Sequence, residues 1–184
     1  MSKAVMLSIR PKWCEKIANG EKTIEVRKTR PKLQTPFKCY IYCTMDHPYI
    51  SVSCGELDKL NYRTNTVGRC NGKVIGEFTC DRIYELAPLN HAPDDVEKQA
   101  CLTREEIVNY LKGTGYGWHI SDLKIYDKPK ELRSFWKADK CPYATESGCT
   151  YKYHCFRAGQ TQRCGETLTR PPQSWCYVDV MQDG

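Results

Sequence analysis

Residues 20–28 constrain this chain more than any other stretch. A turn glycine opens a short strand pattern that carries Lys22, Glu25 and Arg27 among apolar residues. Charges of both signs on one short strand are costly to shield from water unless they face one another or a ligand. The stretch follows a compact amphipathic segment at 11–19, so the charges come just after a helix end. The pattern is typical of a strand that lines a polar cleft.

The two faces of this strand follow from the alternation of side chains in extended backbone. Alternation places Thr23, Glu25 and Arg27 on one face, and Ile24 and Val26 on the face toward the core. A lysine at the start of the strand reaches the polar face from the turn. The alternative is a solvent-exposed salt bridge, which is worth about 0–1 kcal/mol.

The length and composition predict one globular domain spanning residues 1–184. Hydrophobic residues make up 40% and charged residues 27% of the chain, which are ordinary values for a globular protein. No apolar run approaches the roughly 18 residues that a membrane span needs. Charge interrupts the first ten residues too early for a signal peptide. We therefore expect a cytoplasmic protein with no membrane partner.

The net charge of +6 is concentrated at one end of the chain. Residues 1–40 hold ten basic and three acidic residues, so this end carries +7. Such a basic end indicates a polyanionic partner, although a merely soluble basic surface is the alternative. The side chains expected to contact phosphates beside the cleft are Arg10, Lys12, Lys28, Arg30 and Lys32.

The spacing of apolar residues predicts an α+β fold with about six strands and two helices. The strands are short and punctuated by glycine, which favours a small, mixed and mainly antiparallel barrel over a doubly wound sheet. A capping box beginning at Thr103 marks the second helix. Two irregular insertions are expected, at 45–71 and 139–169. The expected strands are 5–9, 23–28, 37–44, 72–86, 115–126 and 174–181, and the expected helices are 11–19 and 103–113.

Residues 9–12 and 19–28 resemble the signature of the ASCH domain, a branch of the PUA-like superfamily. The signature is a glycine, one residue, a lysine, two residues, a glutamate, one residue and an arginine. Supporting segments lie at 72–78, 116–120 and 171–178. The resemblance covers about 4–44, 72–135 and 170–181.

The resemblance implies a PUA-like β-barrel with helices packed at its openings. In that family a cleft between barrel and helix is the presumed site for RNA or a modified nucleoside. Many members that resemble this chain are bacterial or prophage proteins. We therefore expect an RNA-binding or nucleoside-binding module that needs no organic cofactor.

One branch of the family hydrolyses acylated cytidine with a lysine, a threonine and a glutamate. The lysine matches Lys22, but the threonine falls on Glu25, which is not a hydroxyl nucleophile. Thr23 lies two positions earlier, and Glu77 is a candidate for the catalytic glutamate. A hydrolase acting on RNA or on an acylated nucleoside, either amidohydrolase or ribonuclease, is the second hypothesis, with Lys22 and Glu25 as its acid–base and nucleophilic groups. A protein-interaction adaptor is the third.

Aromatic residues and a histidine add candidates for contact with a base. Trp13, Tyr116 and Trp118 are suited to stacking, which is worth about 1–3 kcal/mol for each base. Core packing is the alternative role, and it suits Trp13, which lies on the apolar face of its helix. His119 is suited to acid–base chemistry or to a structural hydrogen bond.

The twelve cysteines must serve as buried thiols or metal ligands in a reducing compartment. Those in strand-like runs, Cys39, Cys43, Cys80 and Cys176, are predicted to be core residues. A second group lies in a loop-like segment with few apolar residues, which needs a cross-link or a bound metal to be ordered. Four thiolates, or three with His154, complete the tetrahedral shell of a structural zinc, and free thiols are the alternative. The candidate zinc ligands are Cys141, Cys149, Cys155 and Cys164.

Overall fold

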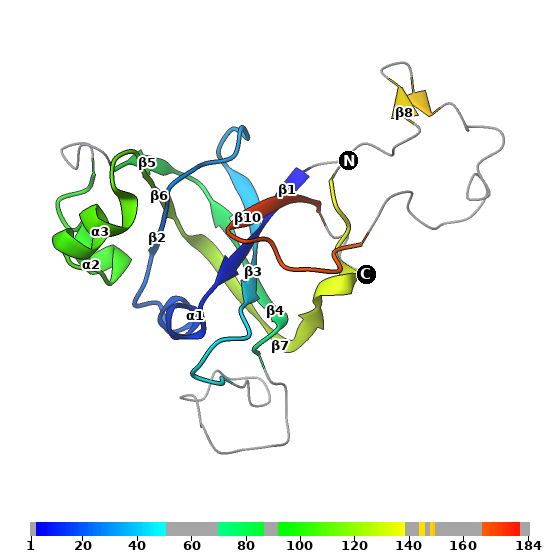
Figure 1. The fold of residues 1–184 in the computed structure, drawn as a ribbon, viewed down its shortest axis with the longest axis horizontal. Coiled ribbons are helices and arrows are strands. Elements are labelled where there is room, and N and C mark those ends of the chain that lie inside the picture. The colour runs from blue at the N-terminus through cyan, green and yellow to red at the C-terminus, as the bar shows by residue number, and fades with distance from the viewer. Residues whose placement is uncertain are drawn as a thin grey trace.

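The fold is an α+β arrangement of two sheets and three α-helices in the computed structural model (Figure 1). The structure describes residues 3–50, 70–86, 92–138, 144–145, 148–149 and 167–180. Most of the two expected insertions lies outside these residues. The described parts of the second insertion are residues 167–169 and a short hairpin of β8 (Ala144–Thr145) and β9 (Gly148–Cys149).

The larger sheet has five strands in the order β10-β1-β3-β4-β7. Its first strand, β1, pairs in parallel with β3 and antiparallel with β10, so Met6 lies between Tyr40 and Cys176. The other pairs are antiparallel, which confirms the expected mixed and mainly antiparallel arrangement. The strands are β1 (Lys3–Ile9), β3 (Phe37–Cys43), β4 (Lys73–Cys80), β7 (Ser121–Glu131) and β10 (Trp175–Asp179).

The smaller sheet has three antiparallel strands in the order β2-β6-β5. The chain passes from one sheet to the other four times, from β1 to β2, from β2 to β3, from β4 to β5 and from β6 to β7. Each expected strand at 72–86 and 115–126 is therefore two strands, and the second pair is separated by Ile120. The strands are β2 (Ile24–Arg27), β5 (Ile83–Glu85) and β6 (Tyr116–His119).

The expected barrel is not closed. Among the described strands, no backbone ladder joins β2 to β10, although each is the end strand of its sheet. The outer side of β10 hydrogen-bonds to residues 136–138, where the N–H of Asp179 donates to the carbonyl of Trp136 at 3.0 Å. Side chains bridge the seam between β2 and β10 instead, because Trp175 donates from Nε1 to Thr29 Oγ1 at 3.0 Å, and the hydroxyl of Tyr177 accepts from the main-chain N–H of Lys32 at 2.8 Å. The prediction of a barrel is therefore corrected to two curved sheets between which the chain crosses four times.

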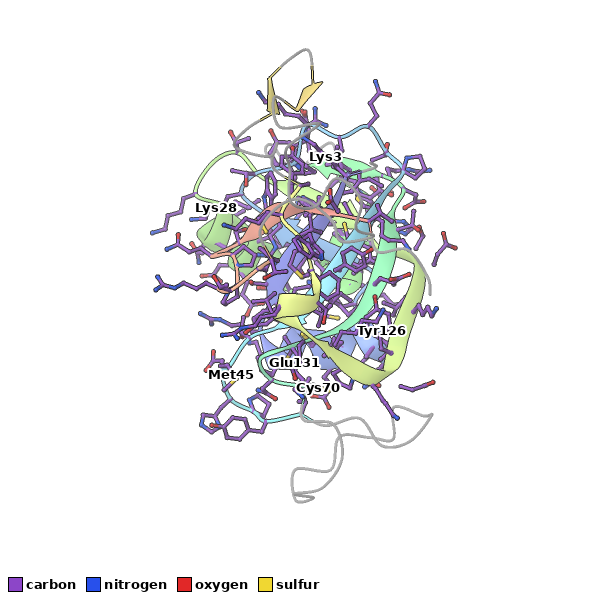
Figure 2. The ribbon with its side chains drawn as sticks, turned by 90° about the vertical axis from the view of Figure 1, so that its right-hand side faces the viewer. Lys3, Lys28, Met45, Cys70, Tyr126 and Glu131 are labelled. Atoms are coloured by element: carbon purple, nitrogen blue, oxygen red, sulfur yellow. The ribbon has the colours of Figure 1, made fainter. Side chains whose placement is uncertain are left out.

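The main core lies between the sheets and contains several of the cysteines (Figure 2). Cys39, Cys43 and Cys80 are fully buried, as predicted, and Cys176 is partly buried against the neighbouring cluster. Burial raises the pKa of Cys39 and raises the pKa of Cys80 to about 12, so these thiols stay protonated. They act as small apolar residues.

Three α-helices pack on the sheets, two of them on the apolar face of β2 and one on the main core. The helix α1 (Pro11–Ala18) begins with proline at its first position, where the missing N–H costs nothing. The helix α3 (Arg104–Leu111) begins with the predicted capping box: Thr103 Oγ1 accepts from the N–H of Glu106 at 3.2 Å, and Glu106 accepts from the N–H of Thr103 at 2.8 Å. The sequence pattern did not indicate α2 (Val96–Ala100), which is only five residues long. None of the described helices is long and apolar enough to cross a membrane.

The apolar face of β2 packs on α2 and α3. Ile24 and Val26 are buried in one cluster with residues of both helices. This burial turns Glu25 and Arg27 to the opposite side of the strand, as the alternation predicts. Packing on one face of β2 therefore positions the charges on the other face.

Candidate functional site

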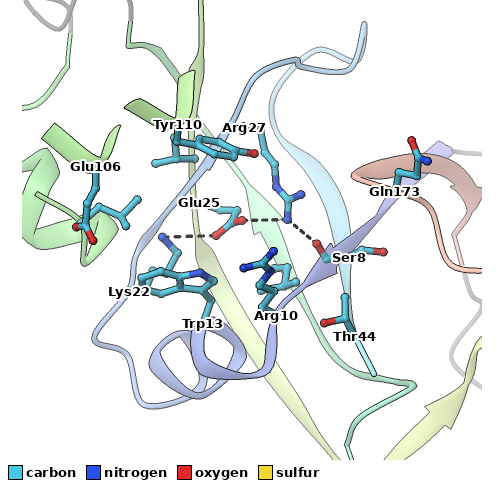
Figure 3. Close-up of a pocket in the computed structure, with 13 residues that line it drawn as sticks. Ser8, Arg10, Trp13, Lys22, Glu25, Arg27, Thr44, Glu106, Tyr110 and Gln173 are labelled. Carbon is cyan, nitrogen blue, oxygen red and sulfur yellow. Dashed lines mark hydrogen bonds and ion pairs between the residues drawn. The ribbon is translucent and has the colours of Figure 1, made fainter. Parts of the chain in front are cut away.

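A cavity of about 410 Å³ opens beside the charged face of β2 (Figure 3). Its walls come from the end of β1, from α1, from β2 and from α3, and the short segment before β10 contributes one side. These segments are far apart in the chain, so the tertiary fold alone assembles the cavity. The lining residues are Ser8, Ile9, Arg10, Trp13, Lys22, Glu25, Val26, Arg27, Thr44, Leu102, Glu106, Tyr110 and Gln173.

Lys22, Glu25 and Arg27 form a continuous ion-pair network on the floor of this cavity (Figure 3). Glu25 Oε1 lies 2.9 Å from an Arg27 terminal nitrogen, and Glu25 Oε2 lies 3.5 Å from Lys22 Nζ. All three residues are at least 94% buried. The solvent-exposed salt bridge considered as an alternative is therefore excluded, and the side chains face one another beside a cavity.

The ammonium group of Lys22 also ties the site to helix α2. Lys22 Nζ donates to the main-chain carbonyl of Ala100, the last residue of that helix, at 2.7 Å. A cation at this end stabilises carbonyls that lack intrahelical partners. The same nitrogen lies 5.1 Å from the centre of the Trp13 ring. Lys22 therefore joins α1, β2 and α2.

The guanidinium of Arg27 crosses the seam that no backbone ladder closes among the described strands. One terminal nitrogen donates to the main-chain carbonyl of Ser8 at 2.8 Å, and the other to Ser174 Oγ at 3.2 Å. Its Nε is buried without a hydrogen-bond partner among the described residues. A phosphate gripped by both terminal nitrogens of Arg27 would have to displace these protein acceptors. Arg27 thus holds the cavity together as well as lining it.

Two aromatic rings stand on either side of Glu25 at the mouth of the cavity (Figure 3). Trp13 projects from α1 and is half-buried, while Tyr110 projects from α3 and is 44% exposed. Lys12 lies 4.3 Å from the centre of the Trp13 ring, and Lys28 lies 5.3 Å from that of Tyr110. Each ring therefore carries an exposed cation beside it.

The expected phosphate contacts are distributed around this mouth. Arg10 lines the cavity, is exposed, and makes only a loose ion pair with Asp46 at 3.8 Å. Lys28 lies at the periphery of the molecule (Figure 2). Arg30 lies 5.7 Å from the ring of Tyr116 and does not line the cavity, and neither does exposed Lys32. The basic residues therefore share one region without all belonging to one pocket.

Two candidates for hydrolytic chemistry lie outside the cavity. Thr23 Oγ1 donates to Gln99 Oε1 at 3.3 Å and does not line the cavity. Glu77 accepts from Lys38 at 2.9 Å and from the hydroxyl of Tyr126 at 2.6 Å, on a different part of the sheet. Burial alone would raise the pKa of Glu77, but these hydrogen bonds outweigh it and lower the pKa below its usual value. Neither residue reaches Lys22 and Glu25.

Trp118 and His119 are also outside the cavity. Trp118 is fully buried and packs at 5.8 Å from Phe37, so its predicted role in stacking on a base is corrected to core packing. His119 Nδ1 lies 2.6 Å from a carboxylate oxygen of Asp81. Burial alone would raise the pKa of Asp81, but this hydrogen bond and the electrostatic attraction of His119, together with hydrogen bonds from the main chain and Ser121, outweigh burial and lower the pKa. This pairing fits the structural alternative for the histidine.

The structure adds residues that the sequence pattern did not single out. Tyr110 follows the apolar pattern of α3 yet is exposed at the cavity. Thr44 Oγ1 is buried beside the cavity without a partner among the described residues. The hydroxyl of Ser8 donates to the main-chain carbonyl of Pro172 at 2.6 Å. The sequence gives one indication that Tyr110 is exposed: α3 carries more apolar residues than its buried face can hold, and only Ile107 and Leu111 are buried.

The predicted zinc site stays a prediction. Cys149 falls in β9, and the other candidate ligands (Cys141, Cys155, Cys164 and the substitute His154) lie outside the described residues. Within the described part of the chain, no three His, Cys, Asp or Glu side chains are placed to hold a metal ion.

The arrangement of two open, connected sheets with helices packed against them is similar to the fold of solved ASCH domain structures. The ASCH protein of Zymomonas mobilis is similar, with 16% identity and a TM-score of 0.52 over 96% of this chain and 87% of that chain. A serine-to-alanine mutant of that Zymomonas mobilis protein is similar at 15% identity, with a TM-score of 0.54 over 96% and 88%. At this identity the likeness concerns the fold alone. No family model and no curated protein matches the sequence.

Proposed function

We propose that the cavity beside β2 is a binding site for RNA or a modified nucleoside. One observation carries this proposal: a carboxylate held between two buried cations forms the floor of a cavity whose mouth has an aromatic ring on either side. The fold shared with the ASCH protein supports the same interpretation.

The buried charges support a site more than they support stability. Desolvating several charges costs about as much as their mutual attraction returns, so apolar residues of similar size would stabilise the fold as well. Charges kept next to a cavity are therefore characteristic of functional sites. The cavity volume of about 410 Å³ lies within the range of roughly 300–1,000 Å³ for small-molecule sites. A nucleoside is of suitable size.

The rim supports an anionic extension of the ligand. Arg10, Lys12 and Lys28 are exposed around the mouth, and both lysines lie against aromatic rings. Exposed cations position a phosphate backbone without reading its sequence, whereas stacking rings accept bases. This combination favours a nucleotide chain over an uncharged small molecule.

Binding is favoured over the hydrolase hypothesis by the positions of the polar groups. Lys22 and Arg27 each donate to main-chain carbonyls, so both have a holding role already. Thr23 and Glu77, the groups that hydrolysis of an acylated nucleoside would enlist, do not line the cavity. The adaptor hypothesis gains no specific support from the described residues.

A salt titration of RNA binding tests the proposal. Fluorescence anisotropy with a labelled single-stranded RNA should show a logarithm of affinity that falls linearly with the logarithm of salt concentration. The double variant Arg10→Ala, Lys12→Ala should reduce the slope by about 0.7 for each phosphate that the protein no longer neutralises. Lys128→Ala removes an exposed charge away from the cavity and serves as the control.

Two results would contradict the proposal. One is the absence of binding to single-stranded RNA and to nucleosides by the folded protein. The other is RNA binding whose salt dependence falls as much in Lys128→Ala as in a single replacement of Arg10 or of Lys12 by alanine. Such binding would reflect the net charge of the protein and not this site.

A further inference from the structure

The floor of the cavity presents its polar groups in the order donor, acceptor, donor. Glu25 stands in the middle, with Lys22 Nζ 3.5 Å from one carboxylate oxygen and a terminal nitrogen of Arg27 2.9 Å from the other (Figure 3). A lysine and an arginine can only donate hydrogen bonds, and a carboxylate between two cations only accepts them. The row therefore has a defined hydrogen-bonding pattern.

Each member of the row retains capacity after its contacts within the protein are counted. Lys22 has three N–H groups, of which Ala100 and Glu25 take two among the described residues. Arg27 has five N–H groups: Glu25, Ser8 and Ser174 take three of the four on its terminal nitrogens among the described residues, and its Nε is enclosed by the protein. Each oxygen of Glu25 has a second lone pair. A ligand that completes this row needs an acceptor, a donor and an acceptor in sequence.

Only one of the common base edges has this pattern. The pairing edge of uracil or thymine is a carbonyl, an N–H and a second carbonyl. Cytosine presents an amino group, a ring nitrogen and a carbonyl; guanine presents a carbonyl followed by two donors; and adenine presents an amino group and a ring nitrogen. We infer that the cavity selects a uracil-type base, and that its imide N–H donates to Glu25 while its two carbonyls accept from Lys22 and Arg27. This inference rests on the proposed function, because it names the base within the same site.

The walls of the cavity are suited to a flat ring in this orientation. Trp13 and Tyr110 stand on either side of Glu25 at the mouth (Figure 3), so a base whose edge meets the floor lies between two aromatic faces. Stacking accepts every base, so it contributes affinity without choice. The preference for one base comes from the floor of the cavity. A base with a different edge places a donor against Lys22 or Arg27, or an acceptor against Glu25, and leaves these buried charges without hydrogen bonds.

Calorimetric titration of the intact protein with uridine and 3-methyluridine tests the inference directly. The methyl group removes only the imide N–H and leaves both carbonyls. Uridine should bind, and 3-methyluridine should bind about 10- to 100-fold more weakly. Cytidine, adenosine and guanosine should show a similar loss, and octamers of U and C should repeat the ranking at higher affinity if the rim contacts phosphate.

The outcomes separate this inference from the proposed function. Preference for another base, or equal affinity for uridine and 3-methyluridine, would overturn the uracil assignment and leave RNA or nucleoside binding intact. Failure of every nucleoside and octamer to bind would remove both.

A variant gives a second, independent readout. Glu25→Gln replaces the acceptor-only group by an amide of the same shape and should abolish the discrimination between uridine and 3-methyluridine, whereas Lys128→Ala should retain it. Circular dichroism reports whether Glu25→Gln folds. If it does not, the comparison of the two nucleosides on the natural chain decides the question.

Discussion

Arg27 contacts Glu25 and the main-chain carbonyl of Ser8 with the same terminal nitrogen, at 2.9 and 2.8 Å. One guanidinium therefore orients the carboxylate on the cavity floor and joins β2 to β1. Because no backbone ladder closes the seam among the described strands, this side chain couples the shape of the site to the stability of the fold.

Replacing Arg27 by methionine should destabilise the protein by about 3–5 kcal/mol, because it leaves Glu25 buried with a weaker partner and removes the bonds to Ser8 and Ser174. Urea denaturation followed by circular dichroism measures this change. Arg82→Met changes an exposed arginine and should alter stability by no more than about 0.5 kcal/mol. Equal effects of the two replacements would show that Arg27 does not hold the seam.

Glu77 should give stability that depends on pH. Its folded-state pKa lies below the unfolded value, so its contribution is complete above the unfolded pKa of about 4.3 and is lost as the pH falls through the folded pKa. Glu77→Gln should therefore cost about 1 kcal/mol at pH 7, and the difference from the natural chain should shrink below pH 4. Urea denaturation at pH 7, 5 and 3.5 tests this, and a difference that does not change with pH would contradict it.

Two glycines should respond to alanine for different reasons. A Cβ at Gly76 would lie 2.5 Å from the main-chain oxygen of Lys124, so Gly76→Ala must move β4 away from β7. A destabilisation of about 1–3 kcal/mol or more is expected.

Gly20 has open space around it but a φ of +73°, so Gly20→Ala should cost about 1 kcal/mol and Gly20→Asn less. Thermal unfolding of these three variants and of Gly76→Asn checks the order. A Gly76→Asn variant more stable than Gly76→Ala would contradict the steric explanation.

The capping box of α3 should contribute about 1 kcal/mol. Thr103→Ala removes the acceptor for the N–H of Glu106 and should lower stability by that amount, while Thr103→Ser or Thr103→Asp should restore most of it. Because α3 carries Tyr110, the alanine variant should also weaken nucleoside binding slightly. Denaturation and titration of the same three variants measure both effects, and a Thr103→Ser variant as unstable as Thr103→Ala would rule out capping.

The zinc prediction is tested by metal analysis of protein purified without added metal. About one zinc per chain is expected, and replacing either Cys149 or Cys155 by serine should release it. Chelation should then increase proteolysis within 139–169 while leaving the cavity residues protected. Absence of zinc, with all four thiols reacting freely with a thiol reagent, would favour the alternative of free cysteines.

Much of the candidate site follows from local pattern. Alternation alone predicts that Ile24 and Val26 face a core and that Glu25 and Arg27 share the other face, because the side-chain period of a strand is two. The capping box at Thr103 is equally local, since both hydrogen bonds join residues three positions apart. The core positions of Cys39 and Cys80 follow from the strand runs that contain them.

The remainder depends on contacts between distant segments, which no local pattern encodes. Tyr116 and Trp118 share one face of β6, and packing against Phe37 and Trp175, which come from distant segments, makes Trp118 inaccessible to a base. The separation of Glu77 from the cavity also depends on how distant strands are arranged in the sheet, which no local pattern indicates. The sequence by itself determined which residues of β2 are polar and which are apolar. The tertiary structure decided that Tyr110 and Ser8 meet them, because strand order and helix packing bring together residues of three separate elements.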